Sequence, residues 1–160
     1  MTRPLILAFA LLALAACSPR GAGSGEPATV RAEGAICRPT PVGRQMTGCY
    51  LTLTAETADR LVSVSSPDAN LVQIHESRIE GGMMMMSELR EGLPLPAGET
   101  VALEPGGNHL MLLGVGEPLV AGDTVALTLT FETSPPLELT ATVGQPAVAA
   151  SGQAAAPAAH

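Results

Sequence analysis

The chain has 160 residues, about the length of one domain, and carries a formal net charge of −7. Aromatic residues make up only 2% of it, which argues against a platform for stacked bases, and the acidic charge argues against nucleic acid as a partner. The 17 Gly and 14 Pro disfavour long helices and favour short strands joined by turns.

The first 16 residues have the pattern of a secretory signal peptide. Arg3 supplies a positive charge, and residues 4–16 form an unbroken apolar stretch that ends in small residues. This stretch is too short for a permanent membrane-spanning helix of about 20 residues. We therefore expect residues 1–16 to be removed and the domain to function in the periplasm.

The residues around the cleavage point indicate a lipid anchor. Residues 14–17, Leu-Ala-Ala-Cys, resemble a bacterial lipobox, which implies that Cys17 becomes the lipidated first residue. The residue after Cys17 is Ser18, which favours the outer membrane, whereas an Asp at this position would favour the inner membrane. The alternative is ordinary signal-peptidase cleavage with Cys17 discarded or free. Residues 17–28 are rich in Gly, Ser and Ala and are expected to form a flexible tether.

Residues 29–143 are expected to form one β domain. Short runs there alternate apolar and polar residues with period two, and many of their residues are β-branched. The expected strands are residues 30–36, 50–54, 61–65, 71–75, 100–103, 109–115, 125–131 and 137–143. Their near-regular spacing predicts an all-β, antiparallel sandwich or barrel. The Ala/Pro-rich residues 144–160 are expected to be disordered.

The remaining cysteines form an even pair within the β domain. Cys37 and Cys49 would be oxidised outside the cytoplasm, and a disulfide would close a short loop between them. The alternatives are two small apolar residues on neighbouring strands, or a thiol pair that binds copper.

Catalytic motifs are scarce, whereas soft metal ligands are not. The β domain has two histidines and no lysine, and it lacks a nucleophile elbow or a phosphate-binding glycine loop. Five methionines, Met83 to Met86 and Met111, fall in the same stretch of chain as His75 and His109. The sequence therefore predicts a binding protein rather than an enzyme.

His109 and Met111 are expected to share one face of a strand, because side chains at i and i+2 project on the same side. Leu110 and Leu112 would then point into the core. We expect His75 to end its strand, with a loop leading on to the methionines. Imidazoles and thioethers together select Cu(I) over zinc, calcium or magnesium.

Simpler explanations of the methionines remain open. Methionine on a strand is commonly core filler, and an exposed methionine patch can bind other proteins. Four adjacent methionines, Met83 to Met86, cannot all face one side of a strand, so at least two should pack or lie exposed.

The same residues resemble the periplasmic copper chaperones of the PCu(A)C family. The resemblance is carried by His75-Glu76-Ser77, the run from Gly82 to Met86, Leu95 to Gly98, and Pro105-Gly106-Gly107 leading into His109-Leu110-Met111. Ten residues separate His75 from Met86, as in the family. Twenty-two separate Met86 from His109, one more than in the family pattern. Met84 also matches a frequent family methionine.

The resemblance implies a cupredoxin-like Greek-key β-barrel that binds one Cu(I) near its surface. The ligands would be His75, Met86, His109 and Met111, with Met84 able to replace Met86. It further implies a chaperone that delivers copper to an accepting periplasmic or membrane-anchored protein, such as cytochrome c oxidase with its binuclear copper centre, or that buffers periplasmic copper. We expect a monomer held at the membrane by its N-terminal lipid.

Two other classes compete with this interpretation. A blue-copper electron carrier shares the fold but needs a Cys thiolate close to its second His and axial Met, and no cysteine follows Cys49. A metal-free β-sandwich lipoprotein would use the methionine run as a protein contact.

Overall fold

Ten strands and no helix make up residues 29–147, the part of the chain that the computed structural model describes. The strands are β1 (Val30–Cys37), β2 (Met46–Ala55), β3 (Asp59–Ser65), β4 (Ala69–Glu80), β5 (Met83–Glu88), β6 (Leu93–Leu95), β7 (Thr100–Leu103), β8 (Asn108–Val115), β9 (Thr124–Phe131) and β10 (Leu137–Val143). The expected signal peptide, the expected lipidation at Cys17, the expected tether and most of the expected tail lie outside the described residues.

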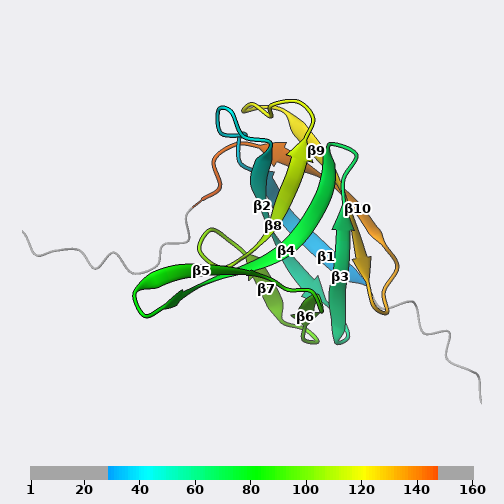
Figure 1. Cartoon of the computed structure of the whole chain (residues 1–160). Helices are drawn as coiled ribbons and strands as arrows, with labels where there is room; N and C mark the ends of the chain where they lie inside the picture. The colour runs from blue at the N-terminus through cyan, green and yellow to red at the C-terminus, as the bar shows by residue number, and fades with distance from the viewer. Residues whose placement is uncertain (1–28, 148–160) are drawn as a thin grey trace, which may run out of the picture.

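Seven of the strands close into a barrel (Figure 1), which confirms the all-β, cupredoxin-like fold. The order around the ring is β4-β8-β2-β1-β10-β9-β3, and β3 returns to β4. Neighbours that are not consecutive in the chain are typical of Greek-key connections. Between residues 29 and 147 no helix is long and apolar enough to cross a membrane.

The antiparallel barrel expected from the sequence contains one parallel pair of strands. β1 and β10 pair in parallel, Ile36 with Thr142 and Cys37 with Val143, whereas the other pairings between strands around the ring are antiparallel. A closed ring with an odd number of strands cannot alternate direction all the way round. One parallel pair is therefore required once seven strands close.

The core fills the inside of the barrel with aliphatic side chains. Alternate residues of β8 and β9 point inward, among them Leu110, Leu112, Leu127 and Leu129, and each of these is at most 1% exposed. Burying one such side chain contributes about 1.5–3 kcal/mol relative to leaving it in water. This rigid wall fixes the outward-facing residues of the same strands.

The β4–β5 hairpin extends beyond the barrel as an arm (Figure 1). β4 continues past the expected end at His75 to Glu80, and Gly81-Gly82 turn the chain into β5. Both glycines have positive φ, 58° and 81°, which two-residue hairpin turns of type I′ require. The loop expected after His75 is thus a paired strand, because the Gly-Gly turn lets the chain fold back along β4.

Asp59 ties the end of β9 to the start of β3. Its carboxylate accepts hydrogen bonds from the backbone N–H groups of Arg60, Thr133 and Ser134, at 2.7, 3.0 and 2.9 Å. Burial raises the pKa of Asp59, but hydrogen bonds from Ser134 and from the other two N–H groups outweigh burial and lower the pKa below its ordinary value. The charged form therefore stabilises this corner of the barrel.

Candidate metal centre

Two histidines face each other on the neighbouring strands β4 and β8. The antiparallel register pairs His75 directly with His109, and their ring centroids lie 5.7 Å apart in an edge-to-face arrangement. Leu110 and Leu112 point to the other side of β8, into the core, as expected from the alternation of side chains. Strand pairing thus joins two imidazoles that are far apart in the sequence.

One hydrogen bond fixes the tautomer of His109. The residue is 5% exposed, and its Nδ1 lies 3.1 Å from the carbonyl oxygen of Gly107. Because a carbonyl can only accept, Nδ1 carries the proton and donates it. Nε2 is then the nitrogen with the free lone pair, so it is the atom that can bind a metal.

His75 is oriented in the complementary way. Its Nε2 lies 3.0 Å from Oε1 of Gln73, and an amide oxygen accepts, so Nε2 donates. Nδ1 is buried and has no hydrogen-bond partner among the described residues. An unpaired buried acceptor costs about 1–3 kcal/mol, so a ligand for this nitrogen would relieve that cost.

The surroundings of His75 favour its neutral form. Burial lowers the pKa of His75, and the neighbouring His109 lowers this pKa further, whereas the carboxylate of Glu88 acts in the opposite direction. Glu88 lies opposite His75 on β5. A neutral imidazole is the form that donates its lone pair to a metal.

The register of the arm divides its four methionines between two faces. Met86 pairs with Ser77, and Met84 pairs with Ile79. Ser77 and Ile79 lie two and four residues beyond His75, so Met84 and Met86 share the face of His75. Met83 and Met85 occupy the opposite face. All four side chains are at least 45% exposed, as the sequence required of at least two of them.

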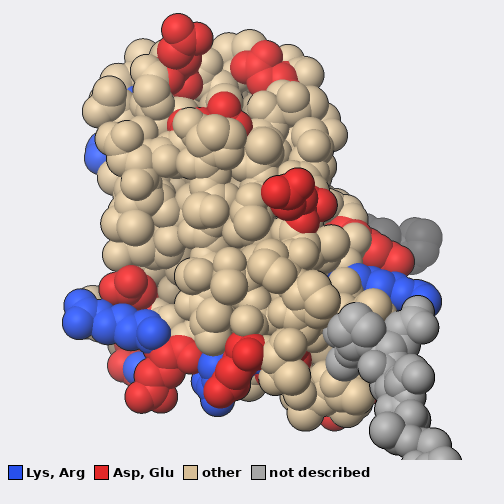
Figure 2. All heavy atoms as spheres, turned by 90° about the vertical axis from the view of Figure 1, so that its right-hand side faces the viewer, with Lys and Arg blue, Asp and Glu red and all other residues tan. Residues whose placement is uncertain are grey.

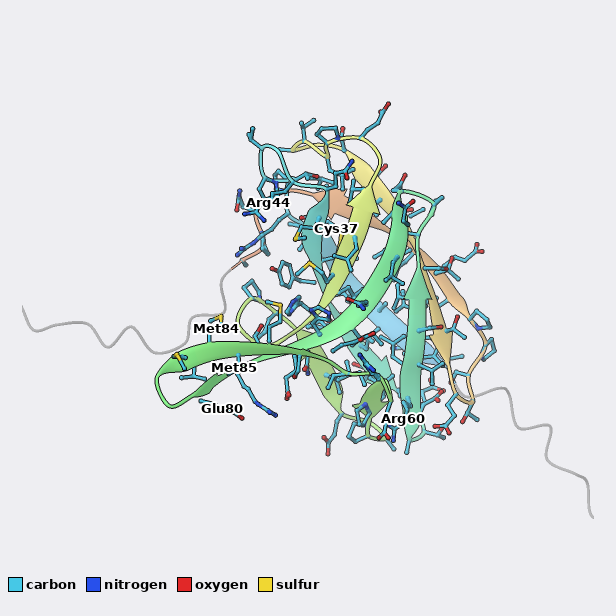
Figure 3. All side chains as sticks on the ribbon, in the orientation of Figure 1. Cys37, Arg44, Arg60, Glu80, Met84 and Met85 are labelled. Atoms are coloured by element: carbon cyan, nitrogen blue, oxygen red, sulfur yellow. A yellow bond between two sulfur atoms is a disulfide. The ribbon has the colours of Figure 1, made fainter. Side chains whose placement is uncertain are left out.

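A groove of about 450 Å³ brings the thioethers together with His109. It is lined by Met84 and Met86 of the arm, by His109 and Met111 of β8, and by Ser77 between them. His75 does not line the groove; it lies beside His109 with its Nδ1 buried. In Figure 3 the arm carries Met84 and Met85 out beyond the barrel wall.

Met46 is a further thioether in the groove that the sequence analysis did not single out. It lies near the start of β2 and is 40% exposed. On β2 it shares a face with Gly48, which pairs with Met111 of β8. Because Met46 stands apart from the other methionines in the sequence, only the β2–β8 pairing reveals it.

The groove wall beyond Met111 is closed by Tyr50 and Arg38. The Tyr50 ring centroid lies 6.4 Å from that of His109, and the Arg38 guanidinium carbon lies 5.6 Å from the Tyr50 centroid. Gly48 leaves room for this ring, because a Cβ there would lie 3.0 Å from the Tyr50 hydroxyl oxygen. Small and aromatic residues thus shape the wall.

Cys37 and Cys49 form a disulfide directly beneath the groove. The two residues pair across β1 and β2, and Cys49 also pairs with Leu110 of β8. Both are fully buried. A copper-binding thiol pair is therefore ruled out for these two residues, and neither can supply the thiolate of a blue-copper site.

The donor set at this site is soft and uncharged. Between residues 29 and 147 no three His, Cys, Asp or Glu side chains cluster as a metal site, so Glu88, although opposite His75, does not form such a cluster with the two imidazoles. The groove lining beside His109 offers thioethers and no thiolate or carboxylate. Zinc and the alkaline-earth cations prefer those missing ligands. Two imidazoles and neighbouring thioethers are ligands that suit Cu(I). One imidazole nitrogen, Nδ1 of His75, is buried and has no hydrogen-bond partner among the described residues.

Comparison with known proteins gives matches to both sequence and fold. The LpqE-like family model, whose description is of a lipoprotein, matches residues 30–143. A relative from Leifsonia xyli subsp. xyli, named as the lipoprotein Lxx21020, is 32% identical over an alignment of 143 residues that covers 84% of this chain and 86% of the relative.

Solved structures of similar fold include copper-bound proteins. Apo-DR1885 from Deinococcus radiodurans is 31% identical, with a TM-score of 0.55 over 92% of this chain and 97% of that one. CuI-DR1885 is 29% identical, with a TM-score of 0.53 over 78% and 82%. The copper-bound PCuAC domain of PmoF2 has a TM-score of 0.61 over 76% and 97%, and at 24% identity it supports the fold alone.

Proposed function

The chain belongs to the LpqE-like family and has the fold of PCu(A)C domains, and from this premise we propose that it is a Cu(I)-binding copper chaperone. CuI-DR1885 is a Cu(I)-loaded protein of this fold with 29% identity to the chain. The resemblance noted in the sequence is thereby confirmed at the level of family and fold.

The observation that carries the proposal is the pair of oriented imidazoles beside the thioethers. His109 Nε2 and His75 Nδ1 are left as lone-pair donors by the bonds that their other ring nitrogens make. Met111 and Met86 line the groove at the same face. We assign Cu(I) to His75, Met86, His109 and Met111.

Met86 is the first choice over Met84 because of the register of the arm. Met86 lies opposite Ser77, two residues from His75, whereas Met84 lies opposite Ile79, four residues from His75. A paired strand rises about 3.4 Å per residue, so Met84 begins roughly 7 Å farther out. Met84 could then take the ion as Met86 releases it.

A site of this kind suits transfer rather than retention. All four proposed ligands are neutral, and Met86, which lies on the arm, is 50% exposed. An accepting protein can therefore replace the ligands one at a time, beginning with the thioethers of the arm, without releasing the ion to water. The copper stays Cu(I) throughout, so no electron acceptor is needed.

The physiological setting is part of the same proposal. Copper would pass to a periplasmic or membrane-anchored protein such as cytochrome c oxidase, or be buffered in the periplasm. Lipidation of Cys17 would hold a monomeric protein at the membrane, the outer membrane being favoured by Ser18. The lipoprotein name of the Leifsonia relative supports the anchor.

Competition with a colorimetric Cu(I) chelator tests the copper site. The wild-type protein should withdraw one equivalent of Cu(I), and His109→Ala/Met111→Ala should lose it. Met83→Ala/Met85→Ala is the matched control, because both side chains lie on the opposite face of the arm. Circular dichroism of each variant separates loss of ligands from loss of fold. No competition by the wild type would refute the proposal and favour the metal-free interaction module.

A further inference from the structure

The groove differs in charge from the rest of the protein. Residues 29–147 contain fourteen Asp and Glu but only six Arg, and yet the groove is lined by Arg38 and by no carboxylate. Figure 2 views the side of the barrel turned away from the arm, where carboxylates are scattered over a largely uncharged surface and arginines lie next to carboxylates along its lower part. The groove therefore presents a positive charge with no carboxylate beside it in the lining, which favours an anion there.

The arginines next to the groove are free of intramolecular ion pairs. In the described part of the chain the ion pairs use Arg60, Arg78 and Arg90, and no carboxylate there lies within 4.0 Å of the guanidinium of Arg38 or Arg44. Arg38 rests on Tyr50. Arg44 is exposed on the β1–β2 loop, and Figure 3 places it on the same side of the barrel as Met84.

Exposed apolar side chains surround these cations. Met46, Met84 and Met86 are 40%, 64% and 50% exposed, and two prolines of the β1–β2 loop line the same groove. Val42, at the tip of that loop, is fully exposed. Apolar surface of this kind next to unpaired positive charge is typical of a protein-binding site with a charged rim.

We propose that the groove between the arm and the β1–β2 loop is a docking surface for an acidic segment of the copper-accepting protein. This inference rests on the proposed function for the role of the partner. Carboxylates of the segment would meet Arg38 and Arg44, and its apolar and thioether side chains would cover Met46, Met84 and Met86.

The bound Cu(I) ion strengthens the preference for an acidic partner. Cu(I) held by neutral ligands keeps its full positive charge, and Arg38 adds a second one near it. A carboxylate brought into the groove interacts favourably with both, which raises the rate of association and suppresses basic partners. The effect should weaken as salt screens the charges, over a distance of about 10 Å at 0.1 M ionic strength.

An anionic membrane surface is the less favourable occupant. Membrane recognition through charge commonly uses clusters of about four to eight basic residues, and the groove offers two. Its concave, methionine-lined shape also suits an inserted side chain better than a flat layer of headgroups. We therefore commit to the protein partner.

Binding of two synthetic peptides to the full-length, metal-free protein tests the docking surface. One peptide alternates Met with Asp, and the other alternates Met with Asn. The Asp peptide should bind about tenfold more tightly at low salt, a difference of about 1.4 kcal/mol, and this preference should disappear in Arg38→Gln/Arg44→Gln. Arg60→Gln, the same change outside the groove, should retain it. Thermal unfolding of each variant checks the fold.

Three results would overturn the inference. Equal binding of the two peptides would do so, as would a preference for Asp that survives in the double variant. Binding to phosphatidylserine vesicles that the double variant abolishes would assign the arginines to a membrane instead. Because the peptides are tested without copper, failure of the Cu(I) titration and failure of docking are observed separately.

Discussion

Reduction of the Cys37–Cys49 disulfide should destabilise the barrel by about 3 kcal/mol. The two cysteines are 12 residues apart in sequence, and the loop-entropy relation for a ring of that size gives about 2.8 kcal/mol at 25 °C. Urea unfolding of the oxidised and reduced wild-type protein measures the difference directly. With a slope of about 1.5 kcal/mol/M, the midpoint should fall by about 2 M.

This comparison keeps the sequence and the core side chains unchanged, so packing losses do not confuse it. Cys37→Ala/Cys49→Ala should lose more than reduction alone, since both side chains are fully buried and their replacement also leaves a cavity. A midpoint that moves by less than about 0.5 M on reduction would refute the reasoning, because opening the bond would then release little conformational entropy in the unfolded chain.

Three further predictions concern single positions. Gly92→Ala should lower the free energy of unfolding by about 2 kcal/mol or more, because Gly92 has a φ of +83° and a Cβ would clash with a backbone carbonyl of β3. Gly43→Ala, at a φ of +75° in open space, should lower it less. Equal losses of stability in thermal or urea unfolding would contradict the steric part of the argument. The pKa of Asp59 is lowered, so the stability that Asp59 contributes should be complete above the ordinary aspartate pKa and be lost as the pH falls through the lower folded value. Unfolding of Asp59→Asn across this range should therefore show a flatter pH dependence than unfolding of the wild type. Parallel curves for the two proteins would argue against this role of Asp59. Met86→Leu should weaken Cu(I) binding in the chelator titration while Met85→Leu leaves it unchanged, and the reverse order would reassign the faces of the arm.

The strand pattern of the barrel was largely predictable, because the barrel wall imposes period two. The eight expected ranges all fall within strands of the structure, and the assignment of Leu110 and Leu112 to the core is confirmed. β6 was missed because a Leu-Pro-Leu stretch is short and contains a proline, which suits only an edge strand. The parallel β1–β10 pair follows from closure of the ring, which no local pattern reports.

The arm was missed for a different reason. A run of four methionines is uniformly apolar, so it shows no alternation, and both faces of β5 are exposed. The signal that could have found the arm is Gly81-Gly82, a pair that favours a two-residue hairpin turn. That turn converts the four consecutive methionines into two on the histidine face and two on the opposite face.

The proximity of His75 and His109 depends on register, which the sequence specifies only indirectly. The spacing of His109 and Met111 could be interpreted from the sequence, because it lies within one strand. The ring nitrogens of His75 and His109 that keep a free lone pair could not be assigned from the sequence, since they depend on the Gln73 amide and on the Gly107 carbonyl. Met46 likewise joined the groove only through the β2–β8 pairing.

The single parallel pair also determines where the two ends of the chain leave the barrel. β1 runs eight residues from Val30 to Cys37, about 26 Å at 3.3 Å per residue, and delivers the chain to Arg38 at the groove. β10 runs alongside it in the same direction and ends with Val143 next to Cys37. A lipid anchor ahead of Val30, as proposed for Cys17, would therefore hold the groove at the far end of β1, directed away from the anchor. A fusion partner attached after Val143 would instead emerge beside the groove and compete for the space that a copper acceptor needs, so transfer assays should leave the C-terminal end untagged.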